Sequence, residues 1–255
     1  MRIFRIVLAC AVALGLAQAA TAAGWGNIKG TVTYVGANIP ANPVAANVPP
    51  QEKAVCCAKG GPHTDEWVVN PANRGVRYVL VWLAPTAKNT SNEPRQLPIN
   101  PALRAVPNKP VLLDQPLCRY IPHVLAIRQG QAVLAKNSAK IAHNVKWAGI
   151  KNPGNNVLLP SGASHLIKGL KPERTPVAVE CNIHPWMKAW IGVFNHPYFA
   201  VTDENGNFEI KDAPAGNWRL IAWQDSTGWV APAGKAGLPI TVKPGETTAV
   251  TFKIK

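Results

Sequence analysis

Acidic residues are scarce in this sequence. Thirteen Asp and Glu residues stand against twenty-seven Lys and Arg residues, which gives a formal net charge of +14. The few carboxylates are dispersed along the chain, so no pair of them suggests a catalytic acid and base. No Ser, His and Asp arrangement of the kind used in nucleophilic catalysis is evident either. We therefore expect no enzymatic activity of the protein's own.

Long apolar runs and helical periodicity are also lacking. Beyond the N-terminus no stretch approaches the ~20 consecutive apolar residues of a transmembrane helix. No segment shows a convincing 3.6-residue period, whereas twenty-four Pro and twenty Gly residues separate short runs rich in Val, Ile and Thr. This pattern predicts an all-β protein of short strands.

The N-terminus has the features of an export signal. Arg2 and Arg5 precede an apolar run over residues 6–16, and small residues follow as far as Ala22. Residues 1–23 are therefore predicted to be a cleaved signal peptide, which implies a periplasmic or secreted protein. Cys10 would allow a lipoprotein cleavage site instead, but the apolar run before it would be very short.

The positive charge invites nucleic acid as a partner, but its distribution does not fit one. The basic residues are scattered singly, without an arginine-rich run or an aromatic RNA-binding signature. Loss of Arg2 and Arg5 with the signal would leave a charge of about +12. We expect this cationic surface to steer an acidic protein partner or to face a membrane surface, the alternative being charge that serves solubility alone.

Strand-like runs divide the chain into four parts. Residues 24–84 hold two strands, and residues 85–110 form a polar connection rich in Pro and Asn. Residues 111–197 carry six or more short strands separated by turn signals, which suggests a sandwich or barrel. Residues 198–255 carry further strands, with a hairpin signal at Asp203-Glu204-Asn205-Gly206.

The most informative motif is Cys181-Asn-Ile-His184-Pro-Trp-Met187 at the junction of two predicted strands. His143 lies 38 positions before Cys181, in a strand where His143, Val145 and Trp147 share one face. Two imidazoles, a thiolate and a thioether favour copper over hard cations, and the set matches the ligands of a blue-copper site. Zinc would gain little from Met187, and a c-type haem would require a C-x-x-C-H motif that is absent.

These motifs resemble a known family. KNSAKIAHNVKW and CNIHPWM are similar to the two ligand motifs of the cupredoxins, with a short ligand loop most like that of amicyanin. The resemblance covers about residues 111–194 and implies a Greek-key β-sandwich with one type 1 copper and a role in one-electron transfer. It also implies that Asn144 ties the two ligand loops together. A Cu(I) carrier or delivery protein, and a module that binds no copper, are the competing interpretations.

A second resemblance concerns the two ends of the chain. GTVTYVG, TDENGNFEI and APAGNWRL are similar to segments of the carboxypeptidase regulatory-like, transthyretin-type β-sandwich. Residues 24–84 and 198–255 each hold too few strands to close a core, but together they supply a normal sandwich. The cupredoxin domain would then be an insertion. The alternative is two consecutive domains, with the N-terminal strands in the cupredoxin sheet.

Aromatic residues flank the ligand loop. We expect Trp186 and Pro185 to form an apolar docking surface around an exposed edge of His184, and Trp190 to pack in the core. Four further histidines have no ligand-like companions and receive no metal role: His63, His123, His165 and His196.

Four cysteines remain after signal cleavage, in a compartment that permits disulfides. We expect one of Cys56 and Cys57 to pair with Cys118, which leaves one thiol unexplained. The alternative is a second metal site formed by Cys56, Cys57 and His63.

Overall fold

The computed structural model describes residues 24–86, 96–232 and 234–255. The predicted signal peptide lies outside the described residues. Nearly all regular structure is β-strand, which confirms the predicted all-β fold. The helical pieces described are short 3-10 turns and one turn of α-helix, α1 (Lys53–Cys56). None of the described helices is long and apolar enough to cross a membrane.

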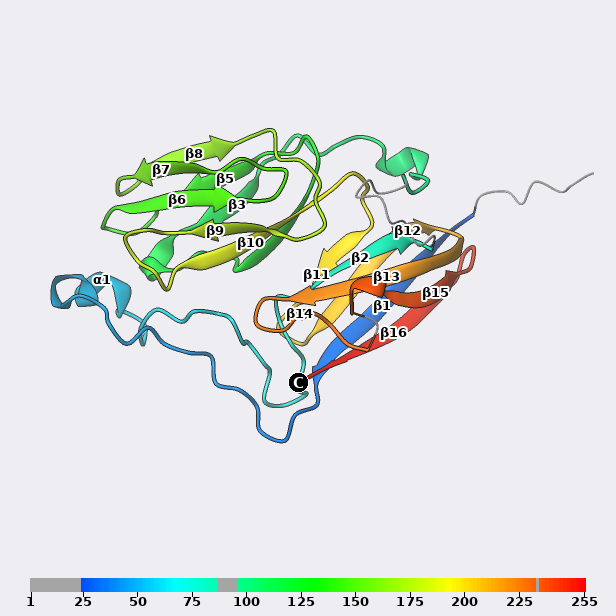
Figure 1. The fold of residues 1–255 in the computed structure, drawn as a ribbon, viewed down its shortest axis with the longest axis horizontal. Helices are drawn as coiled ribbons and strands as arrows, with labels where there is room; N and C mark the ends of the chain where they lie inside the picture. Colours follow the sequence, from blue (N-terminus) through cyan, green and yellow to red (C-terminus); the bar gives the residue numbers. More distant parts are fainter. Residues whose placement is uncertain (1–23, 87–95, 233) are drawn as a thin grey trace, which may run out of the picture.

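Strands from both ends of the chain form one pair of sheets, here called the terminal sandwich (Figure 1). In its first sheet β1 is central, pairing with β12 on one side and running parallel to β16 on the other. In its second sheet β2 lies between β11 and β13, and β13 also pairs with β14 and β15. The strands are β1 (Trp25–Tyr34), β2 (Leu80–Pro85), β11 (Phe199–Val201), β12 (Asn207–Pro214), β13 (Gly216–Gln224), β14 (Gly228–Trp229), β15 (Leu238–Val242) and β16 (Thr247–Ile254).

Buried and exposed side chains alternate along these strands, and the buried ones form the core of the terminal sandwich. In β16, Val250, Phe252 and Ile254 are buried and the residues between them are exposed. Ile28 of β1 and Leu220 of β13 are fully buried in the same cluster. Because strands before residue 86 pair with strands after residue 198, neither group closes its sheets alone. The boundaries of an inserted domain stay a prediction.

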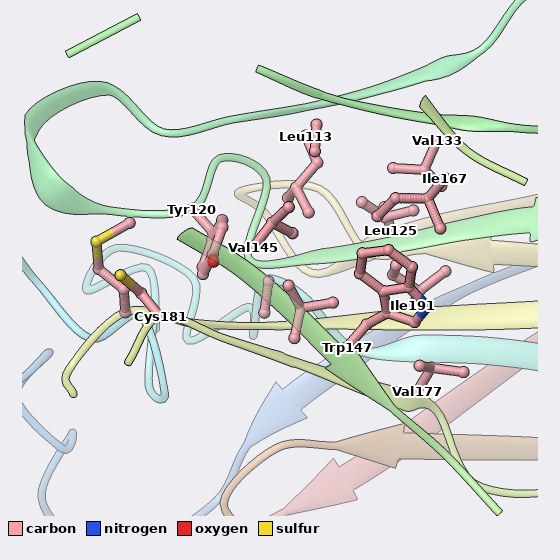
Figure 2. Close-up of a cluster of buried hydrophobic side chains, with 14 of the residues drawn as sticks. Leu113, Tyr120, Leu125, Val133, Val145, Trp147, Ile167, Val177, Cys181 and Ile191 are labelled. Atoms are coloured by element: carbon pink, nitrogen blue, oxygen red, sulfur yellow. The ribbon is translucent and has the colours of Figure 1, made fainter. Parts of the chain in front are cut away.

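The middle of the chain forms two more sheets, here called the ligand sandwich. The larger has the order β4-β10-β9-β6-β7, and the smaller has the order β3-β5-β8. The strands are β3 (Val111–Asp114), β4 (Val124–Arg128), β5 (Val133–Lys136), β6 (His143–Ala148), β7 (Asn155–Leu159), β8 (Ser164–Ile167), β9 (Val177–Glu180) and β10 (Lys188–Phe194). Their inward side chains make a continuous apolar core that includes Cys181 at one end (Figure 2).

A third apolar cluster joins the two sandwiches. Leu80 and Trp82 of β2 pack there with Val124 and Phe194 of the ligand sandwich. Gly192 makes the approach possible, since a Cβ at this position would lie 2.7 Å from a methyl carbon of Leu80. Both faces of β2 are therefore covered, which explains its unbroken run of apolar residues.

The connection over residues 85–110 was expected to lie at the surface. Among its described residues, some are exposed and others are buried. Leu97 is buried in the core of the terminal sandwich. Asn100 donates its backbone N–H to the Tyr198 hydroxyl at 2.9 Å, and its side chain accepts from the N–H of Ala102 at the start of a short 3-10 turn, η2 (Pro101–Leu103).

A segment with little regular structure, residues 36–75, leaves β1 and reaches the ligand sandwich before returning (Figure 1). We call it the strap. It carries η1 (Pro50–Glu52) followed by α1, and a disulfide joins Cys56 of α1 to Cys118 of the ligand sandwich.

The insertion is testable by excision. Replacing residues 85–197 with a short Gly/Ser linker should leave a protein with β-type circular dichroism and cooperative thermal unfolding, because β2, β11 and β13 retain their partners. The exposed third cluster would lower solubility, so polar replacements of Trp82 and Trp223 accompany the excision. A disordered product, beside a folded protein comprising residues 24–197, would refute the insertion.

Candidate metal centre

The ends of three adjacent strands assemble the candidate site. His143 begins β6, Cys181 directly follows β9, and His184 and Met187 lie in the loop that leads into β10. β6 and β9 are antiparallel, and Lys146 pairs with Glu180. This register places the start of β6 beside the end of β9, so His143 and Cys181 meet although they are far apart in sequence.

Two backbone hydrogen bonds close the ligand loop. The N–H of Met187 donates to the carbonyl of His184 at 2.9 Å, and the N–H of Cys181 donates to the carbonyl of Met187 at 3.1 Å. The loop therefore turns back on itself between its first and last ligand candidates. Met187 is buried in the same apolar cluster as Cys181.

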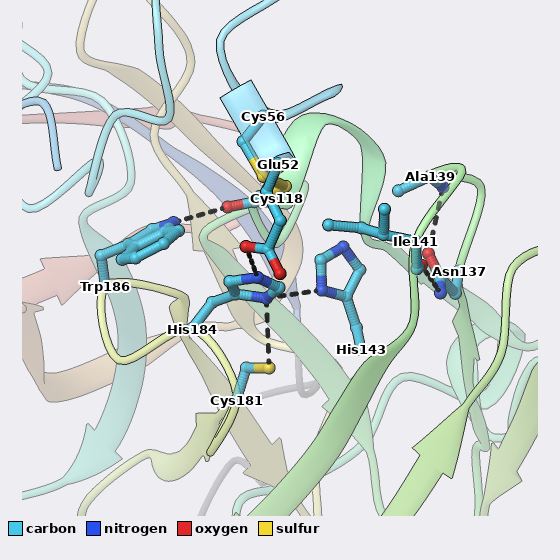
Figure 3. Close-up of a disulfide and its surroundings, with 10 residues drawn as sticks. All are labelled: Glu52, Cys56, Cys118, Asn137, Ala139, Ile141, His143, Cys181, His184 and Trp186. Carbon is cyan, nitrogen blue, oxygen red and sulfur yellow. Dashed lines mark hydrogen bonds and ion pairs between the residues drawn. A yellow bond between two sulfur atoms is a disulfide. The ribbon is translucent and has the colours of Figure 1, made fainter. Parts of the chain in front are cut away.

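Three donor atoms converge at this point (Figure 3). His143 Nδ1 lies 2.9 Å from His184 Nδ1, which lies 3.9 Å from Cys181 Sγ. All three side chains are at least 97% buried. His143 Nε2 has no hydrogen-bond partner among the described residues. Two imidazole Nδ1 atoms and a thiol thus face one another in a water-excluded space, and these atoms suit a borderline or soft metal ion as ligands.

Asn144 links the two ligand segments, as the resemblance implies. Its Oδ1 accepts the N–H of Asn182 at 2.8 Å and lies 3.3 Å from Cys181 Sγ. Its amide nitrogen donates to Asn156 Oδ1 of β7 at 2.7 Å. The side chain is therefore fixed at both ends, and it holds the loop after β9 against β6.

The surroundings of Cys181 favour its thiolate. Burial alone raises the pKa of this thiol, but hydrogen bonds from His143 and His184 lower it by more, and the net pKa is about 6. The pKa of His184 shifts in the opposite direction: burial lowers it, while Cys181 and Glu52 raise it by more. A thiolate is the form that binds metal ions.

Glu52 of the strap is an unexpected member of the site. Its Oε2 lies 2.8 Å from Nε2 of His184, and only 1% of the His184 side chain is exposed. The prediction of an exposed His184 edge is wrong, because the strap covers that edge (Figure 3).

Trp186 is likewise not a free docking surface. Its indole N–H donates to the carbonyl of Cys118 at 3.0 Å, and its ring centroid lies 5.0 Å from that of His184. Ile183 and Pro185 remain exposed beside it. Trp190 packs against the third cluster, as predicted, and its ring centroid lies 5.0 Å from that of Trp223.

The predicted disulfide is confirmed between Cys56 and Cys118, with their Cα atoms 5.1 Å apart. The alternative metal site is wrong, because the oxidised sulfur of Cys56 cannot act as a thiolate ligand, and His63 instead lies 3.2 Å from the carbonyl of Asn42. Cys57 is a half-buried free thiol.

Tyr120 is a second residue that sequence reasoning missed. Its hydroxyl lies 2.7 Å from the carbonyl of Asn144 and 3.0 Å from the carbonyl of Glu180. It therefore bridges the two strands that carry His143 and Cys181. No local pattern marks this role, because a buried Tyr in a β-protein is usually a packing residue.

The remaining histidines have other partners. His123 lies between the carbonyl of Lys188 at 3.0 Å and Asp225 Oδ2 at 2.9 Å, and so links the two sandwiches. His196 accepts the N–H of Tyr198, and burial lowers the pKa of His196 to about 3. His165 stacks on Trp147.

The lowered pKa of Cys181 has a measurable effect on the metal-free protein. Because the folded pKa lies near 6, below the ordinary 9.0, the stabilisation is fully present above pH 9 and is lost as the pH falls towards 6. The free energy of unfolding should drop in this interval by less than about 1.4 kcal/mol per pH unit, because the raised pKa of His184 acts in the opposite sense. Denaturant titrations across it would measure the slope. Cys181→Ser, which lacks the titrating thiol, should lose this component, and an equal slope in both proteins would contradict the assignment.

No protein-family model and no curated protein matches the chain. Among solved structures, a mutant of amicyanin, Cu(I), is 18% identical over 34% of this chain and 85% of that chain, with a TM-score of 0.31. A purple cupredoxin from Nitrosopumilus maritimus is 19% identical, and the match covers 32% of this chain and 98% of that chain with a TM-score of 0.29. A Cu-containing nitrite reductase from Thermus scotoductus SA-01 is 26% identical, and the match covers 38% of this chain and 27% of that chain with a TM-score of 0.31.

Proposed function

We propose that this protein is an exported, type 1 copper protein that carries single electrons between redox partners. One copper ion would be held by His143, Cys181, His184 and Met187. The observation that supports this best is the convergence of two Nδ1 atoms and one thiol in a buried space, with separations of 2.9 and 3.9 Å.

The donor set fits copper better than other metals. Hydrogen bonds from His143 and His184 lower the pKa of the Cys181 thiol to about 6, so it offers a thiolate under neutral conditions. Imidazole and thiolate would also suit zinc, but a buried thioether from Met187 would add little to a zinc site. Bound copper would supply a one-electron couple between Cu(I) and Cu(II).

The chain's own residues would keep this site rigid and dry. Asn144 and Tyr120 fix the ligand segments to each other, so the donors need to move little when the charge of the site changes. Burial of all three donors keeps bulk water away from them. These properties suit a carrier better than an enzyme.

The other parts of the chain fit the same proposal. On the sequence resemblance, the terminal sandwich would be a carboxypeptidase regulatory-like domain, and a cupredoxin domain would be inserted into it. The excess of basic residues would attract an acidic redox partner by long-range electrostatics.

A periplasmic copper-binding or delivery protein without an electron-transfer role is the second candidate. The buried thiol of Cys181 and the buried thioether of Met187 favour it, since both donors also suit Cu(I). A reversible redox couple with an intense visible band would support the carrier, and tight Cu(I) binding without such a couple would support delivery.

Cys181→Ser tests the thiolate ligand. The intense visible absorption of a type 1 site arises from charge transfer between thiolate and copper, so the serine variant should lose it entirely. Absorption spectra of both proteins after addition of Cu(II) would show this. Cys57→Ser is the matched control and should retain the band. An unchanged band in Cys181→Ser would exclude Cys181 as a ligand.

Met187→Leu tests the axial role assigned to the thioether. The variant should keep its copper and have a higher reduction potential, because loss of a weak donor destabilises Cu(II) more than Cu(I). We expect a shift on the order of tenfold in the Cu(I)/Cu(II) equilibrium, or about 59 mV. Redox titration measures it. A potential that stays the same or falls would mean that Met187 is not axial.

A further inference from the structure

Glu52 contacts the candidate copper site from outside the ligand sandwich. It ends η1 on the strap, 132 residues before His184 in sequence, and its Oε2 lies 2.8 Å from Nε2 of His184. The Glu52 side chain is 21% exposed, whereas that of His184 is 1% exposed. The carboxylate is thus partly hydrated on one side and meets a buried imidazole on the other.

The direction of the His184 ring defines the chemistry of this contact. Nδ1 faces His143 and Cys181, so Nε2 is the nitrogen that faces away from the site. When Nδ1 uses its lone pair for a metal ion, the neutral ring carries its proton on Nε2. That N–H donates to the Glu52 carboxylate, and a hydrogen bond to an ionised acceptor is about twice as strong as a neutral one.

We propose that Glu52 is a positioning residue for His184 that lowers the reduction potential of the bound copper, a role that rests on the proposed function. A carboxylate that accepts the second N–H of a ligand imidazole fixes the orientation of the ring and makes the imidazole a stronger donor. A stronger donor and a nearby negative charge both stabilise Cu(II) relative to Cu(I).

A disulfide holds the strap, and with it Glu52, close to His184. Cys56, four residues after Glu52, is bonded to Cys118, whose carbonyl accepts the Trp186 N–H at 3.0 Å. Both sulfurs and a ring nitrogen of His184 lie within 4.8 Å of one another. Glu52 is therefore held against the ligand loop by a covalent link a few residues away.

Two substitutions separate the charge of Glu52 from its shape. Glu52→Gln keeps an acceptor oxygen of similar size but no charge, and Glu52→Ala removes both. We expect the reduction potential to rise in the order wild type, Glu52→Gln, Glu52→Ala. The alanine variant should shift the Cu(I)/Cu(II) equilibrium about tenfold, which is 59 mV for one electron.

Glu180→Gln is the matched control for loss of a negative charge near the site. Glu180 adjoins Cys181 in sequence, and its side chain is 46% exposed and pairs with Lys146 at 3.1 Å. Solvent screens such a charge, so its removal should change the equilibrium less than about twofold. If Glu52→Ala shifts the potential no more than Glu180→Gln does, the proposal is wrong.

A second measurement needs no copper. In the metal-free protein, the nuclear magnetic resonance spectrum should show a slowly exchanging, downfield Nε2 proton on His184. The signal should move in Glu52→Gln and disappear in Glu52→Ala. A wild-type ring that is protonated on Nδ1 alone would overturn the positioning role. If the wild type binds no copper, the proposed function fails, and this ring proton alone decides whether Glu52 positions His184.

Discussion

The antiparallel pairing of β6 with β9 is the constraint on which the rest of the site depends. Its register sets Lys146 opposite Glu180, and so brings the start of one strand to the end of the other. A slip of one residue would turn His143 away from Cys181, because successive side chains point to opposite faces of a sheet. Tyr120 and Asn144 reinforce this register from inside the sandwich, by contacts with the backbone on both sides of the site.

The terminal sandwich contributes to the site through two connections. The strap delivers Glu52 and is fastened by the disulfide to Cys118. In addition, the third apolar cluster and the contact between His123 and Asp225 fix the ligand sandwich to β13 and the turn that follows it. Residues near both ends of the chain thereby affect a centre whose ligand candidates all lie in the middle.

Much of this arrangement could be predicted from sequence, because it depends on local patterns. The alternation in TAVTFKIK and in HNVKW predicts strands and their buried faces, and the spacing of Cys181, His184 and Met187 predicts a ligand loop. β7 lacks a buried face that an alternating pattern could reveal, because its side chains are mostly exposed. Glu52 and Tyr120 could not be assigned, since their roles arise from contacts across 132 and 60 residues. The expected exposure of His184 failed for the same reason.

The most direct test of a copper-binding function is titration of the metal-free wild type with Cu(II), followed by absorption and electron paramagnetic resonance spectra. The site described here predicts one copper per chain, an intense visible band, and the narrow copper hyperfine splitting of a thiolate-bound type 1 centre. A protein that binds no copper, or that shows only a weak band and wide splitting, would contradict the central claim.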